Sequence, residues 1–313
     1  MQRHKIPSRA GVVIIALVVG LAAGCGGSGK KSLSTTTAAT TGTTGTTGTT
    51  GTPARDRKVA AEVPTAIKAK GTLVVASNAH YPPDEFFGSD GRTVIGMDPD
   101  MATAVAAVMG LKVKVVNARF STIIPGLSSS KYDLGMSSIT DTKQREKAVD
   151  FVTYFEAGTS FYVNTTGGTV IQNGLADLCG HSAVVGRGTT QARDATAQSA
   201  KCKAAGKPGV NVFVYPNQTA VAVAVSRGRG IGMADSPVAA YIVVQSKGKL
   251  KLTGTPYNVA PYGIAIPKGN GMAKPVLDAL KVLMATGAYK PILSRWYVLS
   301  GAIANPQINA AIF

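Results

Sequence analysis

The sequence predicts an α/β protein with two lobes, each a mostly parallel sheet flanked by helices. Of the 313 residues, 45% are apolar, enough to form a buried core, which excludes wholesale disorder. Short apolar runs typical of strands alternate with helical stretches along the chain. The alternation occurs once in residues 71–136 and again in residues 183–245, which predicts two sheets and therefore two lobes.

Residues 1–24 have the organisation of a secretory signal. Three basic residues precede an uncharged apolar run, residues 11–23, which is shorter than the roughly 20 residues needed to span a bilayer. Leu21-Ala-Ala-Gly-Cys25 closes the run and resembles the lipobox of bacterial lipoproteins, whose cysteine is acylated after cleavage. We therefore expect an exported protein with a lipid on Cys25, the alternative being an uncleaved anchor.

Residues 25–58 are predicted to be a flexible tether. Threonine and glycine fill residues 35–52, and such a segment buries too little to offset its own ordering entropy. Without residues 1–58 the net charge falls from +17 to +10, with 25 basic and 15 acidic residues. The bases are scattered and only 6% of residues are aromatic, a composition that argues against a nucleic-acid-binding module.

The first lobe is predicted to open with a buried strand at 73–76. A helix follows, with Asp98 as N-cap, Pro99 in its first turn and its end at Gly110. Alternation in 111–115 predicts a strand with one solvated face. Ser121 is expected to cap a short helix that ends at Leu127, before another strand at 132–136.

The second alternating series predicts three more strands and three helices. The strands are 183–186, 210–214 and 231–234, and the helices are 189–200, 218–225 and 237–245. A strand-like run at 262–266 then precedes two helical stretches, 272–286 and 289–298.

Cysteine and histidine usage restricts the chemistry. Cys179 and Cys202 are an even pair in an exported chain and are expected to form a disulfide, with two free buried thiols as the alternative. After the signal only His80 and His181 remain, and no CxxC or HxxxH spacing occurs. We therefore expect no metal site, no cofactor and no Ser-His-Asp or Cys-His catalysis.

Polar residues gather where the predicted strands end, the edge at which open α/β sheets bind ligands. Asp141 and Gln144 have capping-box spacing, which places Arg145 near a helix start. Another helix start follows the strand at 183–186, where free backbone N–H groups favour an anion, and Asp235 ends the strand at 231–234. The candidates are Asn78, Tyr81, Ser138, Thr140, Arg145, Thr189, Thr190, Gln191 and Asp235.

These residues together would suit a zwitterion. Arg145 can bind a carboxylate with two parallel hydrogen bonds, and Asp235 can bind an ammonium group. Each also has a simpler interpretation, because Arg145 could be solvated or salt-bridged, Asp235 could be a turn residue, and Thr189 only a cap. Their common place at strand ends favours the binding interpretation.

Several motifs in this order resemble the family-3 extracellular solute-binding proteins, the amino-acid receptors of ABC importers. The resemblance runs from about residue 60 to 300. Its motifs are Gly71-Thr-Leu-Val-Val, Tyr81-Pro-Pro, Gly96-Met-Asp-Pro-Asp100, Ile124-Pro-Gly-Leu127, Tyr132-Asp-Leu-Gly-Met-Ser-Ser-Ile-Thr140 with Arg145, Val149-Asp-Phe151, Gly188-Thr-Thr-Gln191 and Ala234-Asp235-Ser-Pro.

The resemblance implies a type II clamshell, like the periplasmic binding proteins, that closes on one small ligand. Lobe 1 would be residues 59–159 with 262–313, and lobe 2 residues 160–261. By position, Tyr81 would pack its aromatic face on the ligand and Ser138 and Thr140 would bind its α-substituents. Arg145 and Thr190 would hold the α-carboxylate, Asp235 the α-ammonium, and Gln191 and Asn78 would lie nearer the side chain.

This chain also departs from the family pattern. Many relatives carry an acid where it has Asn78, and the loss of that acid weakens a basic-amino-acid assignment. Either Phe86 or Phe87 could line the cleft in the longer Tyr81-Pro-Pro-Asp-Glu-Phe-Phe87 segment. Arg187 could favour an acidic or polar ligand, or point outward into solvent.

The resemblance therefore implies a monomeric lipoprotein on the outer face of the cytoplasmic membrane. It would capture a polar amino acid and deliver it to an ABC permease, without being an enzyme. The alternative is a clamshell dehydratase that acts on a small carboxylate, for which Glu85 and Glu156 are the possible acids, although we expect both to be solvated.

Overall fold

The computed structural model describes residues 53–313, so the predicted signal, Cys25 and most of the predicted tether lie outside the described residues. Asp56 caps the first helix, α1 (Arg57–Glu62), by accepting hydrogen bonds from the backbone N–H groups of Lys58 and Val59. Thus regular structure begins within the last residues of the predicted tether. Within residues 53–313, none of the helices has both the length and the apolar character that a membrane span requires.

One eight-stranded sheet runs through the described chain in the order β5-β1-β6-β11-β7-β10-β8-β9. Strands β5, β1 and β6 are parallel, as are β10, β8 and β9, while β11 and β7 pair antiparallel between them. The bounds are β1 (Thr72–Ser77), β5 (Lys112–Asn117), β6 (Leu134–Gly135), β7 (Val149–Asn164), β8 (Ser182–Gly186), β9 (Asn211–Tyr215), β10 (Ile231–Asp235) and β11 (Leu250–Pro267).

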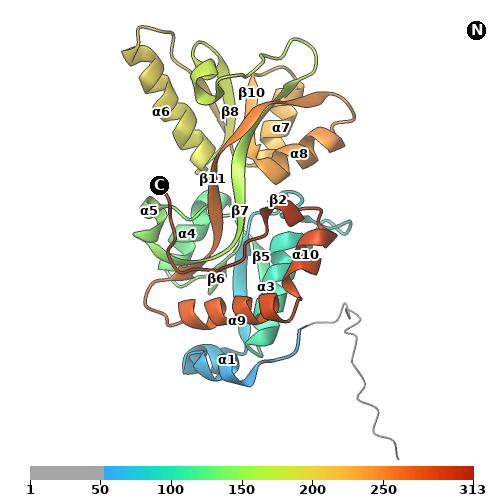
Figure 1. Ribbon diagram of the computed structural model, residues 1–313, viewed down its shortest axis with the longest axis vertical. Coiled ribbons are helices and arrows are strands. Elements are labelled where there is room, and N and C mark those ends of the chain that lie inside the picture. Colours follow the sequence, from blue (N-terminus) through green and yellow to red (C-terminus); the bar gives the residue numbers. More distant parts are fainter. Residues whose placement is uncertain (1–52) are drawn as a thin grey trace, which may run out of the picture. The chain divides into compact units, whose positions relative to one another are not determined.

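The prediction of two separate sheets is wrong, because β7 and β11 run the length of both halves and join them (Figure 1). Strand β7 is almost wholly buried and so has no polar alternation, and Gly158 interrupts its apolar sequence. Strand β11 contains Gly254, Pro256 and Pro261, which usually end strands, and here its ladder accommodates them with register shifts between Thr253 and Ala260.

The lobe around β1, here called the β1 lobe, has helices on both faces of its strands. An apolar core that includes Leu73, Met101 and Leu280 joins β1 to the helices on one face, and a second cluster around Ile123 and Phe151 lies on the other. The helices are α1, α2 (Thr65–Lys70), α3 (Met97–Val108), α4 (Phe120–Ser128), α5 (Lys143–Glu146), α9 (Ala273–Ala285) and α10 (Tyr289–Arg295), followed by the 3₁₀ turn η2 (Leu299–Gly301).

The lobe around β8, the β8 lobe, has its own two apolar clusters. Its helices are α6 (Thr190–Ala204), α7 (Gln218–Ser226) and α8 (Ser236–Gln245), with a 3₁₀ turn η1 (Gly174–Leu178). The disulfide between Cys179 and Cys202 is confirmed: it ties the residue after η1 to α6, with a Cα–Cα distance of 5.6 Å.

A second sheet of three very short strands was not predicted. It consists of β2 (His80–Tyr81), β3 (Glu85–Phe87) and β4 (Val94–Ile95). Segments of two or three residues show no periodicity, so the sequence gives no signal for them. The pairing of Tyr81 with Glu85 in this sheet positions two residues of the site described below.

Three predicted helix caps are wrong. Gly96 is the N-cap of α3, and Asp98 instead accepts hydrogen bonds from Ser138 N and the Tyr154 hydroxyl. Helix α4 begins at Phe120, before the predicted cap Ser121. Thr142, and not Asp141, caps α5. In each case the predicted residue lies within two positions of the true cap, and only α5 of the three has a side chain that bonds to the helix end.

Candidate functional site

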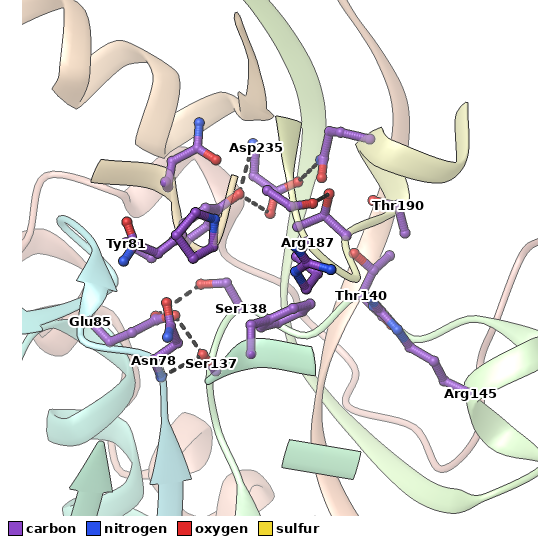
Figure 2. Close-up of a pocket in the computed structure, with 17 residues that line it drawn as sticks. Asn78, Tyr81, Glu85, Ser137, Ser138, Thr140, Arg145, Arg187, Thr190 and Asp235 are labelled. Atoms are coloured by element: carbon purple, nitrogen blue, oxygen red, sulfur yellow. Dashed lines mark hydrogen bonds between the residues drawn. The ribbon is translucent and has the colours of Figure 1, made fainter. Parts of the chain in front are cut away.

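One pocket between the two lobes brings all nine predicted site residues together (Figure 2). They come from the ends of β1, β6, β8 and β10 and from the segments that follow, as expected for an open α/β sheet. The pocket volume is about 30 Å³. Its other lining residues are Glu85, Phe120, Ser137, Gly186, Arg187, Pro216, Asn217 and Gln218.

Arg145 forms the positive side of the pocket. Its two terminal nitrogens donate to the carbonyl oxygens of Thr140, 2.8 Å away, and Gly188, 3.2 Å away. Its guanidinium also lies 5.4 Å from the centre of the Phe120 ring. Burial, and then the charge of Arg193, lower the pKa of Arg145 to about 10. The guanidinium therefore remains charged at neutral pH.

The first turn of α6 lies beside Arg145. Thr189 is its N-cap: the hydroxyl accepts a hydrogen bond from Ala192 N and donates one to Gly186 O. The N–H groups of a helix's first residues have no carbonyl partner within the helix, so the start of a 15-residue helix favours an anion. Thr190 and Gln191 occupy that turn and line the pocket. This side of the site thus combines one guanidinium with a helix start.

Asp235 forms the negative side. Its Oδ2 accepts a hydrogen bond from the Tyr81 hydroxyl at 2.8 Å, and its Oδ1 accepts one from Gln191 Nε2 at 2.8 Å. The backbone N–H of Asp235 donates to the same Tyr81 oxygen at 3.0 Å. Because Tyr81 belongs to the β1 lobe and Asp235 to the β8 lobe, these bonds cross the pocket and hold the lobes together. Burial raises the pKa of Asp235 above its ordinary value.

Neither of these two charges is neutralised by a salt bridge in residues 53–313. The ion pairs there join other residues, such as Lys70 with Asp133 and Arg295 with Asp100. The hydrogen bonds of the Arg145 guanidinium go to neutral carbonyl groups, and those of the Asp235 carboxylate come from a hydroxyl and an amide. A zwitterionic ligand between them could therefore place its negative group on Arg145 and its positive group on Asp235.

Glu85 lines the pocket and is fully buried, so the expectation that it is solvated is wrong. Its Oε1 accepts a hydrogen bond from the Ser137 hydroxyl at 2.8 Å, and its Oε2 accepts one from Ser138 at 3.1 Å. Antiparallel pairing of Glu85 with Tyr81 turns it inward. The isolated sequence cannot reveal this, because β3 has only three residues. Glu156, the other candidate acid, is exposed as expected.

The aromatic lining differs from the expectation as well. Neither Phe86 nor Phe87 lines this pocket: Phe86 packs edge-on against Trp296 and Phe87 against His80. Tyr81 and Phe120 are the aromatic residues that do. Phe120 was missed because it precedes the expected cap Ser121 and follows no strand end recognised in the sequence. Arg187 is exposed, but it also lines the pocket.

The remaining predicted residues have polar partners of their own. Asn78 Nδ2 donates to Ala118 O at 2.8 Å, and its backbone N–H donates to the Ser137 hydroxyl at 2.9 Å. The Ser138 hydroxyl donates to Asp84 Oδ2 at 2.8 Å. Among residues 53–313, no group of three or more His, Cys, Asp or Glu side chains could hold a metal ion.

Comparison with protein families identifies this architecture. The bacterial extracellular solute-binding proteins, family 3, match residues 73–298, which include every predicted ligand residue of the pocket. The chain belongs to this family. The resemblance noted from the motifs is thereby confirmed, and so is the fold class, an α/β type II periplasmic-binding fold.

Curated members of the family and solved structures are similar over most of the chain. The arginine-binding protein ArgT of Corynebacterium glutamicum is 32% identical over 254 residues, 80% of this chain and 83% of that protein. The L-arginine-binding protein of Pseudomonas aeruginosa is 30% identical over 243 residues, 71% and 86% of the two chains. An ancestral arginine-binding protein bound to glutamine is 33% identical, with a TM-score of 0.66, covering 73% of this chain and 98% of its own.

A further solved structure bears on the enzymatic alternative. The ancestral amino-acid-binding protein AncCDT-1, described as a precursor of cyclohexadienyl dehydratase, is 30% identical with a TM-score of 0.64. It covers 74% of this chain and 98% of its own. The curated relatives named above are binding proteins of the same family, so solute binding is the role that the family supports.

Proposed function

We propose that this protein captures a polar amino acid outside the cytoplasmic membrane and delivers it to an ABC permease. The observation that carries the proposal is the placement of Arg145 and Asp235, two charges without a salt-bridge partner among the described residues, on opposite sides of one pocket. The names of several relatives support the ligand class, since these proteins bind arginine, cystine or glutamine.

The ligand would lie between the two charges. Its α-carboxylate would bind Arg145 and the first turn of α6, including Thr190, because both favour an anion. Its α-ammonium would bind Asp235, while Ser138 and Thr140 would contact the same end of the molecule.

The lobes would separate for the ligand to enter, because hydrogen bonds from Tyr81 to Asp235 and from Arg145 to Gly188 cross the pocket. The Tyr81 hydroxyl occupies Oδ2 of Asp235 in the closed pocket, so a ligand ammonium would share or replace that donor. Capture would then be a hinge closure in which the ligand adds contacts to both lobes. The lobes would comprise residues 59–159 with 262–313, and residues 160–261.

The proposed setting is a monomer held on the outer face of the membrane by a lipid on Cys25, with residues 25–58 as its tether. The lipobox-like Leu21-Ala-Ala-Gly-Cys25 supports it. Mass spectrometry of the mature N-terminus tests the anchor: we expect an acylated Cys25 as the first residue. A mature chain that retains residues 1–24 would contradict it.

The test of ligand capture is a thermal-shift panel of the L-amino acids followed by calorimetry. We expect at least one polar amino acid to stabilise the protein. In Arg145→Ala its affinity should fall by about 10- to 100-fold, since hydrogen bonds to charged groups contribute about 1.5–3 kcal/mol. Arg92→Ala, at an exposed loop position, is the matched control and should bind normally. Full affinity in Arg145→Ala would contradict the carboxylate assignment.

A dehydratase is the second candidate, and the observation that favours it is the buried Glu85 in the pocket. Burial, followed by the charges of Asp98 and Asp84, raises the pKa of Glu85 well above its ordinary value. A carboxyl group with a raised pKa is suited to act as a general acid. Turnover of prephenate or arogenate by the purified protein would support this candidate, and binding without turnover would exclude it for those substrates.

A further inference from the structure

Three carboxyl groups meet at one end of the pocket. Glu85 lines it, and Asp84 and Asp98 lie directly behind, all three with no exposed surface. The Ser138 hydroxyl donates to both Asp84 Oδ2, at 2.8 Å, and Glu85 Oε2, at 3.1 Å, while its backbone N–H donates to Asp98 Oδ2 at 2.7 Å. One serine thus connects all three groups, and Figure 2 shows Glu85 beside Ser138 and Asn78.

No cation is paired with these acids in the described chain. Within residues 53–313, no salt bridge reaches any of the three carboxyl groups, whose hydrogen-bond donors are the hydroxyls of Ser137, Ser138 and Tyr154 and the backbone N–H of Ser138. Oδ1 of Asp84 is buried and has no hydrogen-bond partner there. Burying a carboxylate without a cation costs free energy, so binding a positive charge at this end of the pocket would be favourable.

The amino-acid backbone of a ligand would not supply that charge. In the proposed pose its ammonium binds Asp235, which already faces Gln191 and Tyr81, and its carboxylate binds Arg145 on the other side. Glu85 lies on β3 and faces the pocket beside Asn78, apart from both of these groups in Figure 2. The ligand side chain is therefore the part left to meet Glu85.

We propose that Glu85 selects an amino acid whose side chain carries a positive charge, such as a guanidinium or a primary ammonium group. This inference rests on the proposed function and concerns the same pocket. It also explains how a chain with Asn78 can receive a cation: the acid comes from β3, seven residues later in the sequence. Glu85 would contact the side-chain cation directly, and Asp84 and Asp98 would add to the negative potential behind it.

The same arrangement makes binding depend on protons. Burial raises the pKa of Glu85 and of Asp84 well above their ordinary values, and it raises the pKa of Asp98 to about 6. Without a cation these groups therefore hold their protons to higher pH than ordinary carboxyl groups do. An arriving cation lowers the pKa of its partner carboxyl, so the complex should release protons and its affinity should rise with pH.

The experiment compares L-arginine with L-citrulline, which has nearly the same shape but a neutral ureido group. Calorimetry at pH 7.5 should show L-arginine binding about 10- to 100-fold more tightly, the range expected for a charged hydrogen-bonded pair. Repeating the titration in buffers of different ionisation enthalpy should reveal proton release with L-arginine and none with L-citrulline. Both measurements use the unmodified protein, so they do not depend on whether a variant folds.

Glu85→Gln then assigns the selectivity to one residue. It should bind L-arginine about as weakly as L-citrulline, whereas the exposed control Glu156→Gln should behave like the unmodified protein. Equal affinity for L-arginine and L-citrulline in the unmodified protein, or binding of neutral or acidic amino acids alone, would overturn this inference and leave the proposed function standing. No binding of any amino acid would overturn both.

Discussion

The side chains of Arg145 and Asp235 are oriented by hydrogen bonds, although neither forms a salt bridge within residues 53–313. Arg145 is fixed by two carbonyl oxygens, and Asp235 by a hydroxyl and an amide, so both side chains are oriented by neutral groups. Binding energy is greatest when the groups that meet a ligand are already in place, because less freedom is lost on association. The two residues therefore form a preorganised pair of opposite charges.

Asp141 offers a test of residue-level electrostatics outside the pocket. Burial, partly offset by the hydrogen bond from Ala310 N, raises its pKa to about 7, above the ordinary 3.8. The folded protein then binds a proton that the unfolded chain has lost, so this residue makes stability fall as pH rises from about 4 to 7. Asp141→Asn removes the titration and can still accept from Ala310 N.

Between pH 4.5 and pH 7, we expect the free energy of unfolding to fall less in Asp141→Asn than in the unmodified protein. Urea unfolding at both pH values measures this difference. Asp278→Asn, in which the altered residue lies on α9 and pairs with Lys274, serves as the control. An unchanged pH dependence in Asp141→Asn would contradict the assignment.

The residues of the site were predictable only where secondary structure is regular. Arg145, Thr190 and Asp235 follow strands or begin helices that have clear sequence signals, and the structure places all of them around one pocket. Phe120 was not predicted, because it begins a helix whose start was misplaced. Glu85 was named only as a possible acid of the enzymatic alternative and was expected to be solvated, because it lies in a three-residue strand without a sequence signal. Their positions depend on tertiary contacts that local sequence does not encode.

At the scale of elements, the strands of each parallel group were predicted to within a few residues, while the long strands were not. Buried runs such as β1 and β10 are bounded by turn residues and so are easy to recognise. In β11 only residues 262–266 were recognised, since the glycines and prolines before them usually end a strand. The pairing with β7 overrides that local preference.

The disulfide between Cys179 and Cys202 leads to a prediction about the stability of the protein. Cys179 and Cys202 are separated by 23 residues, and closing such a loop restricts the unfolded chain by about 3 kcal/mol. The double variant Cys179→Ala/Cys202→Ala should be less stable by about that amount in urea unfolding. Neither cysteine lines the pocket, so ligand affinity should be unchanged. A loss of stability below about 1 kcal/mol would contradict this structural role.

Within the described residues, β7 and β11 pass from one lobe to the other (Figure 1). Hydrogen bonds between residues of the two lobes also cross the pocket. Three of these bonds involve the site itself, two between Tyr81 and Asp235 and one from Arg145 to Gly188. Opening must break all three. The equilibrium between open and closed forms therefore depends on the same residues that would bind a ligand.

Tyr81→Phe tests that dependence. It removes the hydroxyl while keeping the ring, and with it two hydrogen bonds to Asp235, each of which contributes about 1 kcal/mol net. The closed form of the ligand-free protein should become about 30-fold less favoured, since about 2 kcal/mol corresponds to such a factor. Small-angle X-ray scattering should then report a larger radius of gyration without ligand. An unchanged radius in Tyr81→Phe would contradict a role for this bond in closure.

The central claim is that Arg145 and Asp235 together recognise the backbone of an amino acid. Calorimetry with the L-amino acid that stabilises the protein most, compared with the amine formed by removing its α-carboxylate, tests that claim most directly. We predict that the amino acid binds and that the amine loses at least about tenfold in affinity, the lower bound for a charged hydrogen bond. In Arg145→Ala the difference between the two ligands should disappear. Equal binding of both ligands to the unmodified protein would contradict the account.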